Sequence, residues 1–164
     1  MHSSSPGSSL SVPRITILAS LIALSVVGSY LKIPSPTGTV ALDAVPGYLG
    51  GLYLGFGEGA IIAFLGHILT SLNVGFPLGL PIHLLIGAEM ALIVAVFRLV
   101  YLRWSYLPAI AIAVFLNGVI APLTMVPLFG WGFFTAIILS LVVSSAANAM
   151  LACAIYRLLL KKNG

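Results

Sequence analysis

The chain has 164 residues, of which 60% are hydrophobic and only 6% are charged. This is too little charge to cover the surface of a water-soluble globule, so we expect the chain to lie in a lipid bilayer. At about 20 apolar residues per transmembrane helix, the length allows about six spans and no separate ATPase, nucleic-acid-binding or catalytic domain. The net charge of +4 is therefore interpreted as a signal of membrane topology and not as a polyanion site.

The predicted elements follow in chain order. Residues 1–13 are rich in Ser, Gly and Pro and are predicted to form a flexible tail, whereas residues 14–164 are predicted to form one all-α membrane domain. Gly and Pro clusters mark the loops, including a Pro-rich first loop, and divide this domain into six helices. We expect these helices at residues 14–32, 43–56, 59–72, 81–101, 106–127 and 131–159. The second and third are short for a bilayer crossing and should be tilted, broken or joined to loops that dip into the membrane.

The basic residues predict the direction in which the helices cross the membrane. With the N-terminus in the cytoplasm, Lys32 is the one basic residue that falls on the outer side. The other six fall on the cytoplasmic side: Arg14, Arg98, Arg103, Arg157, Lys161 and Lys162. This distribution agrees with the positive-inside rule, so we predict that both termini are cytoplasmic.

Polar side chains at membrane depth are costly and should face the interior of the bundle. At about 1.5 Å of rise per residue from the expected outer helix ends, polar residues of four helices fall in one layer of the outer half of the membrane. They are His67, Glu89, Asn117 and Ser140. No Lys or Arg lies at the depth of Glu89, which must therefore be protonated, paired with His67 or bonded to a ligand. This layer predicts a binding pocket, whereas Asn148 lies deeper and is predicted to form a hydrogen bond between helices.

Further candidates lie near the outer helix ends. His83 is near the mouth of the fourth helix and is a candidate ligand contact. Tyr48 and Phe76 belong either to an interfacial aromatic belt or to a stacking surface for a flat ligand. Lys32 and Asp43 flank the Pro-rich first loop, where they could pair with each other or gate the pocket.

Ala19 and Ala23 lie one turn apart on the first helix. Small residues at this spacing allow another helix to approach closely. That helix either belongs to the same bundle or belongs to a second membrane protein, in which case the two alanines form a docking surface.

Several chemistries are disfavoured by the motifs that the sequence lacks. It contains no P-loop, HExxH or GxSxG motif, and Glu89 has no second carboxylate at its depth for acid–base work. Cys153 is the one cysteine, and there is no Cys/His cluster. We therefore predict no enzymatic activity, no cofactor and no metal site. A stand-alone carrier or channel is the alternative, although such proteins usually need more buried ionisable groups.

Three stretches between Leu31 and Ala91 point to a family: KIPSPTGT, the Gly66–His67 pair and FPLGLPIHLL. With them the chain resembles the substrate-binding S components of energy-coupling factor (ECF) vitamin transporters, and most of all the S components for α-ribazole, the nucleoside precursor of the lower ligand of cobalamin. The resemblance implies a six-helix bundle in the plasma membrane of a prokaryote, with the vitamin in an outer pocket gated by the first loop.

The same resemblance implies the partners of the chain. Ala19 and Ala23 match the family's alanine motif, through which the first helix would dock on a transmembrane coupling subunit carried by two cytoplasmic ATPases. The pocket residues of the family vary with the vitamin. The ligand contacts named above are therefore inferred from depth and facing, and another vitamin or a nucleobase-like compound is the alternative ligand.

Overall fold

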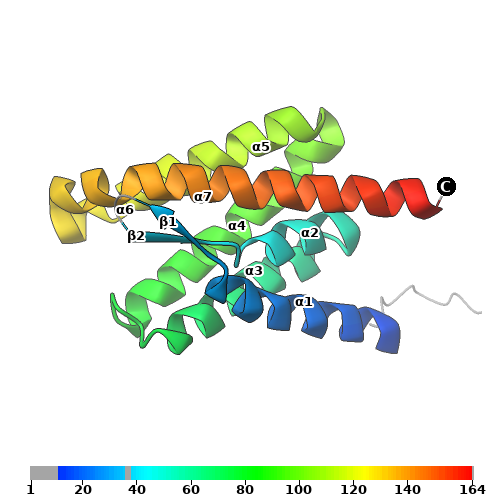
Figure 1. The fold of residues 1–164 in the computed structure, drawn as a ribbon, viewed down its shortest axis with the longest axis horizontal. Coiled ribbons are helices and arrows are strands. Elements are labelled where there is room, and N and C mark those ends of the chain that lie inside the picture. Colours follow the sequence, from blue (N-terminus) through cyan, green and yellow to red (C-terminus); the bar gives the residue numbers. More distant parts are fainter. Residues whose placement is uncertain (1–10, 36–37, 164) are drawn as a thin grey trace, which may run out of the picture.

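The structure is a computed structural model that describes residues 11–35 and 38–163 (Figure 1). The described chain is helical apart from one short antiparallel hairpin, in which Lys32 pairs with Ala41 and Ser35 with Gly38. The hairpin lies where the proline-rich sequence predicted a loop, and the fold is otherwise all-α as expected. In chain order, the elements of the described residues are α1 (Val12–Tyr30), β1 (Lys32–Ser35), β2 (Gly38–Ala41), α2 (Val45–Tyr53), α3 (Phe56–Asn73), α4 (Leu80–Arg103), α5 (Tyr106–Phe115), the π-helix η1 (Leu116–Ile120), α6 (Ala121–Thr124) and α7 (Val126–Asn163).

Four helical segments in residues 11–35 and 38–163 are long and apolar enough to cross a membrane. They are Val12–Tyr30, Leu80–Arg103, Tyr106–Thr124 and Val126–Lys162. Helices α2 and α3 are not among them, although α3 has 18 residues and begins at Phe56, before the predicted start at residue 59. The nine residues of α2 extend over about 14 Å, less than half of the hydrocarbon thickness of about 30 Å. The expected number of six spans therefore stays a prediction.

The first two helices differ from their predicted bounds. Helix α1 begins at Val12 and not at residue 14, because a proline such as Pro13 is compatible with the first helical turn. The second helix was expected at residues 43–56, but α2 ends at Tyr53. Gly55 follows with a φ of 143°, a conformation that favours glycine and stops the helix.

The C-terminal part of the bundle agrees in part with the predicted division. Helix α5 runs through η1 into α6, and α7 begins at Val126, inside the range expected for the fifth helix. Gly130, with a φ of 77° and a ψ of 173°, is not helical, so it separates the first turn of α7 from the long helix that follows it, as its predicted position between two helices implied. Proline is tolerated in a first turn, so Pro127 does not prevent α7 from starting before it.

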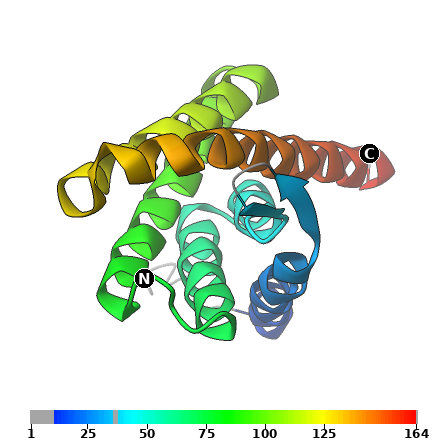
Figure 2. The ribbon, with the colours of Figure 1, turned by 60° about the vertical axis from the view of Figure 1, so that its left-hand side comes forward.

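The bundle has two distinct ends. Helix α1 begins and α7 ends at one of them, which we call the terminal end, and the hairpin points toward the other, which we call the hairpin end (Figure 1). Figure 2 shows the hairpin rising from the end of α1 to α7, beside α2. Helices α2 and α3 approach so closely that a Cβ on Gly59 would lie 2.4 Å from the Cα of Gly51. The core below the hairpin is formed around Tyr48, Val94 and Phe97, which are fully buried.

Two arginines close the C-terminal end of α2. From α4, Arg98 donates hydrogen bonds to the carbonyl oxygens of Gly51 and Leu52. From α1, Arg14 donates to the carbonyl oxygen of Leu54 at 2.8 Å and forms an ion pair with Glu58. The last carbonyls of a helix have no partner within it, so these side chains satisfy groups that would otherwise be exposed to an apolar environment.

Candidate functional site

Three of the predicted pocket residues line one cavity. This cavity, which we call the apolar cavity, has a volume of about 180 Å³ and lies between α3, α4, η1, α6 and α7. His67, Glu89 and Asn117 are its polar lining side chains. Its other lining residues are apolar: Leu78, Ile86, Ala121, Pro122, Met125, Phe133, Ile137 and Leu141. A few polar groups that converge in a mostly apolar hollow are typical of small-molecule sites.

Glu89 has a hydrogen-bonding capacity that the protein does not fill. Its Oε1 atom accepts a hydrogen bond from the hydroxyl of Thr124 at 2.7 Å. Its Oε2 atom is buried and has no hydrogen-bond partner among the described residues. A buried carboxyl oxygen without a partner is costly, so a ligand that donates a hydrogen bond there would be favoured. The partner of Glu89 in the structure is thus Thr124, and the alternative of a pair with His67 is not observed in the described contacts.

Asn117 is positioned by the π-helix η1. Its Nδ2 atom donates a hydrogen bond to the hydroxyl of Ser145 on α7 at 2.8 Å. The π-helix widens one turn of the backbone, and such turns occur frequently at functional sites. A Cβ on the neighbouring Gly118 would lie 2.9 Å from the Cα of Val142, so η1 and α7 pack closely beside the cavity.

His67 forms a pair with a second histidine, His83, which does not line the cavity. The Nε2 atom of His67 is 3.2 Å from the Nδ1 atom of His83, and the hydroxyl of Ser71 is 3.3 Å from the first and 2.9 Å from the second. The ring of Phe76 lies beside that of His83, with 5.6 Å between the centroids. Phe76 has a φ of 49°, a left-handed conformation that costs a bulky residue about 1–3 kcal/mol and that often marks functional sites. The strained turn thereby positions the Phe76 ring against the histidine pair.

A second cavity of about 210 Å³ lies beneath the hairpin, and we call it the polar cavity. Ser29, Lys32, Ala41, Asp43, His67, Thr70, Ser71 and Val74 line it. It therefore contains both predicted gating residues and shares His67 with the apolar cavity. Asp43 accepts a hydrogen bond from Thr70 at 3.4 Å. The predicted pair of Lys32 with Asp43 is not formed among the described contacts, because α3 supplies the partner of Asp43.

Besides His83 and Phe76, two more predicted contacts line neither of the two cavities. Tyr48 is fully buried in the core, where its ring meets that of Phe97 edge to face with 4.7 Å between the centroids. Ser140 is partly buried on α7, next to the lining residue Leu141, but does not itself line the apolar cavity. Position along a helix does not determine the direction of a side chain, and neither of these side chains lines a cavity.

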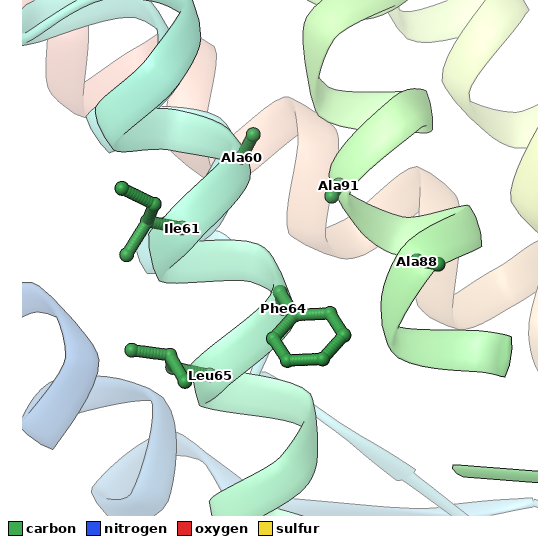
Figure 3. Close-up of a pocket in the computed structure, with 6 residues that line it drawn as sticks. All are labelled: Ala60, Ile61, Phe64, Leu65, Ala88 and Ala91. Atoms are coloured by element: carbon green, nitrogen blue, oxygen red, sulfur yellow. The ribbon is translucent and has the colours of Figure 1, made fainter. Parts of the chain in front are cut away.

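A larger hollow of about 460 Å³ opens between α3 and α4 on the side of the bundle (Figure 3). Phe64 points from α3 toward Ala88 and Ala91 of α4, whereas Ile61 and Leu65 point away from them. All of its lining side chains are apolar: Ala60, Ile61, Phe64, Leu65, Ala88 and Ala91. With no side chain that could orient a polar ligand, this hollow is a poor substrate site.

Ala19 and Ala23 are exposed on the outside of α1. The side of α1 that packs inward carries Leu21, Ser25 and Gly28 instead. Of the two interpretations of the alanine pair, packing within this bundle is therefore not the one observed. The pair lies on a surface that a second helix can approach.

Sequence reasoning missed the partners that fix the pocket residues. Thr124 contacts Glu89 from 35 positions away, and Ser145 contacts Asn117 from 28 positions away. No spacing within one helix reveals such pairs. Ser71 differs from them, because its spacing of four residues from His67 does predict that the two share a helix face.

Comparison with known proteins identifies the family. Residues 13–160 match the family model described as the substrate-specific component of ECF transporters. A solved structure of the S component of a bacterial ECF transporter is similar in fold, with a TM-score of 0.72 and 21% sequence identity over 91% of this chain and 96% of that one. None of the curated proteins compared with the chain matches it.

The family determines the general role of the chain. Such components are substrate-binding transport subunits and not enzymes, and they associate with the membrane and ATPase modules of an ECF transporter. The apolar helices agree with a membrane-embedded protein of this kind. On the match of nine-tenths of its length, the chain belongs to the family of substrate-specific components of ECF transporters.

Proposed function

We propose that this chain is the high-affinity substrate-binding subunit of an ECF-type importer for α-ribazole. The observation that carries the proposal is the convergence of His67, Glu89 and Asn117 from three helical elements on one apolar cavity. No Lys or Arg is among the described residues that line this cavity, so it suits an uncharged ligand better than an anionic one. α-Ribazole is such a ligand, because it joins a flat dimethylbenzimidazole to a neutral ribose.

The two adjoining cavities support a ligand with two unlike halves. The apolar cavity offers Met125, Phe133 and other apolar side chains to a flat ring. The polar cavity offers hydroxyl and carboxylate groups of Ser29, Asp43 and Thr70, which can bind ribose hydroxyls. His67 lines both cavities, and Glu89 can accept a hydrogen bond from whichever part of the ligand reaches its free oxygen.

The topology of the proposal follows from charge. We place the terminal end of the bundle, where α1 begins and α7 ends, in the cytoplasm of a prokaryotic cell, with six spans in total. The hairpin end then faces the outside, and the hairpin with Lys32 and Asp43 gates the pocket. The exposed pair Ala19 and Ala23 docks on the coupling subunit, and two ATPases supply the energy.

Binding measurements on the purified subunit test the proposal. Isothermal titration should show saturable binding of α-ribazole, with weaker binding of 5,6-dimethylbenzimidazole, which lacks the ribose, and of adenosine, which has a different base. Native mass spectrometry of the same protein should detect a bound molecule of the mass of α-ribazole. Detection of another vitamin bound to the protein would reassign the substrate, and failure to bind α-ribazole would refute the proposal.

Transport measurements separate this subunit from a stand-alone carrier. Proteoliposomes that contain this protein alone should bind α-ribazole but should not accumulate it with ATP. Accumulation should require the coupling subunit and the ATPases. Active uptake by the isolated chain would contradict its assignment as a subunit.

A further inference from the structure

The side chain of Asn148 connects α7 to both ends of the short segment that follows the hairpin. Its Nδ2 atom donates a hydrogen bond to the carbonyl oxygen of Ala41, the last residue of β2, at 2.8 Å. Its Oδ1 atom accepts one from the backbone N–H of Ala44, which precedes α2, at 3.1 Å. Asn148 is 1% exposed, so these hydrogen bonds form in a dry environment where they are strong.

One of these contacts satisfies a backbone group that α2 leaves without a partner. Ala44 is the N-cap of α2, and its N–H group is among the first four of the helix, which have no acceptor within it. Ser144, one turn before Asn148, adds a hydrogen bond from its hydroxyl to the carbonyl oxygen of Ala41 at 3.3 Å. Asn148 therefore joins α7 to the N-terminus of α2, in agreement with the hydrogen bond between helices that its depth predicted, and it also holds the base of the hairpin.

The opposite side of the same base is held by α1. The carbonyl oxygen of Gly28 accepts hydrogen bonds from the N–H groups of Leu31 at 3.0 Å and of Leu42 at 3.2 Å, one at each end of the hairpin. Each strand has only four residues, and an isolated two-stranded hairpin of this size is marginally stable. The direction of the hairpin thus depends on how its base is anchored.

The anchored segment is also a wall of the candidate site. Ala41 and Asp43 line the polar cavity, and both lie within the segment that Asn148 spans. We propose that Asn148 is a positioning residue that fixes the hairpin over the polar cavity and thereby slows the escape of the bound ligand. The part that concerns ligand escape rests on the proposed function.

A spin label on the hairpin tests the anchoring without any ligand. The label is attached to Thr39→Cys on β2, in a Cys153→Ala background that removes the buried native cysteine. Asn148→Leu, which has a similar volume but forms no hydrogen bonds, should increase the mobility of the label. Ser144→Ala should increase it less. Ser25→Ala is the matched control, since it removes a buried serine hydroxyl that bonds within α1 and not to the hairpin.

The dissociation rate of α-ribazole provides the functional readout. With two hydrogen bonds lost, Asn148→Leu should raise this rate by about 10-fold to 100-fold, whereas Ser25→Ala should leave it unchanged. If Asn148→Leu does not fold, Asn148→Ala provides the same readouts. Unchanged label mobility in a folded Asn148 variant would overturn the proposal, even if the thermal midpoint falls. A wild-type protein that binds no α-ribazole would refute the proposed function, and the label would still decide the role of Asn148.

Discussion

The Nε2 atom of His67 lies 3.2 Å from the Nδ1 atom of His83, and the hydroxyl of Ser71 lies within hydrogen-bond distance of both. Two neutral imidazoles can share one hydrogen only if one nitrogen donates and the other accepts. The arrangement therefore fixes the orientation of both rings. It also leaves His67 as the member of the pair that lines the two cavities, whereas His83 lines neither.

The first prediction separates the roles of these two histidines. His67→Gln should weaken the binding of α-ribazole by about 2-fold to 10-fold, the effect of one neutral hydrogen bond, because this side chain lines both cavities. His83→Gln should mainly lower the thermal midpoint, because His83 is buried. Titration calorimetry and thermal unfolding on the same samples check both outcomes, and the reverse pattern would move the site from His67 to His83.

The second prediction concerns Glu89. Glu89→Gln keeps an oxygen that can accept from Thr124 but removes the charge from the unpartnered oxygen. A hydrogen bond to a charged group is worth about 1.5–3 kcal/mol, so the affinity for α-ribazole should fall by about 10-fold to 100-fold with little change in the thermal midpoint. Thr124→Val is the control, since it removes the hydroxyl that donates to Oε1 of Glu89 but leaves the carboxylate of Glu89 in place. Unchanged affinity in well-folded Glu89→Gln would exclude Glu89 from the site.

The third prediction concerns the exposed alanines of α1. Ala19→Trp or Ala23→Trp should abolish uptake of α-ribazole by cells that contain the complete transporter, because the bulky ring keeps a partner helix away. Binding to the isolated subunit should be unchanged, since both side chains face outward. Ala111→Trp, at an exposed alanine of α5, should leave uptake intact. Equal losses of uptake and binding would show that the alanine pair supports the fold and not docking.

The fourth prediction concerns Gly28. A Cβ there would lie 2.4 Å from the carbonyl oxygen of Leu42, a backbone atom that no rotamer change can move away. Gly28→Ala should therefore lower the free energy of unfolding by about 1–3 kcal/mol through overpacking at the hairpin base. Gly57→Ala is the matched control, because a Cβ at Gly57 meets nothing within 4 Å and alanine favours the helix. Equal thermal midpoints for the two variants would contradict this prediction.

The convergence of His67, Glu89 and Asn117 could be anticipated from the sequence because counting residues along apolar helices gives depth. Tyr48 was placed near the outer helix ends, but position along a helix says nothing about the direction in which a side chain points. Tyr48 points into the core because α2 packs closely on α3 and α4, with small residues such as Gly51 at the contact. Direction thus depends on packing partners that one sequence does not reveal.

The hairpin and its anchors were hidden for a different reason. Strands of four residues are too short to show a periodic pattern, and Pro34 within β1 argues against a strand. Asn148 lies 107 positions from Ala41, so their hydrogen bond leaves no local signal. Arg98 was interpreted as a topology signal, yet in the structure it also closes α2.

The shortness of α2 bears on how the nascent chain enters the membrane. A segment of nine residues is too short to be released from a translocon as a transmembrane helix. Its last carbonyls accept hydrogen bonds from Arg98, which is synthesised 46 residues after Leu52. The contacts that close α2 can therefore form only after α4 has been synthesised.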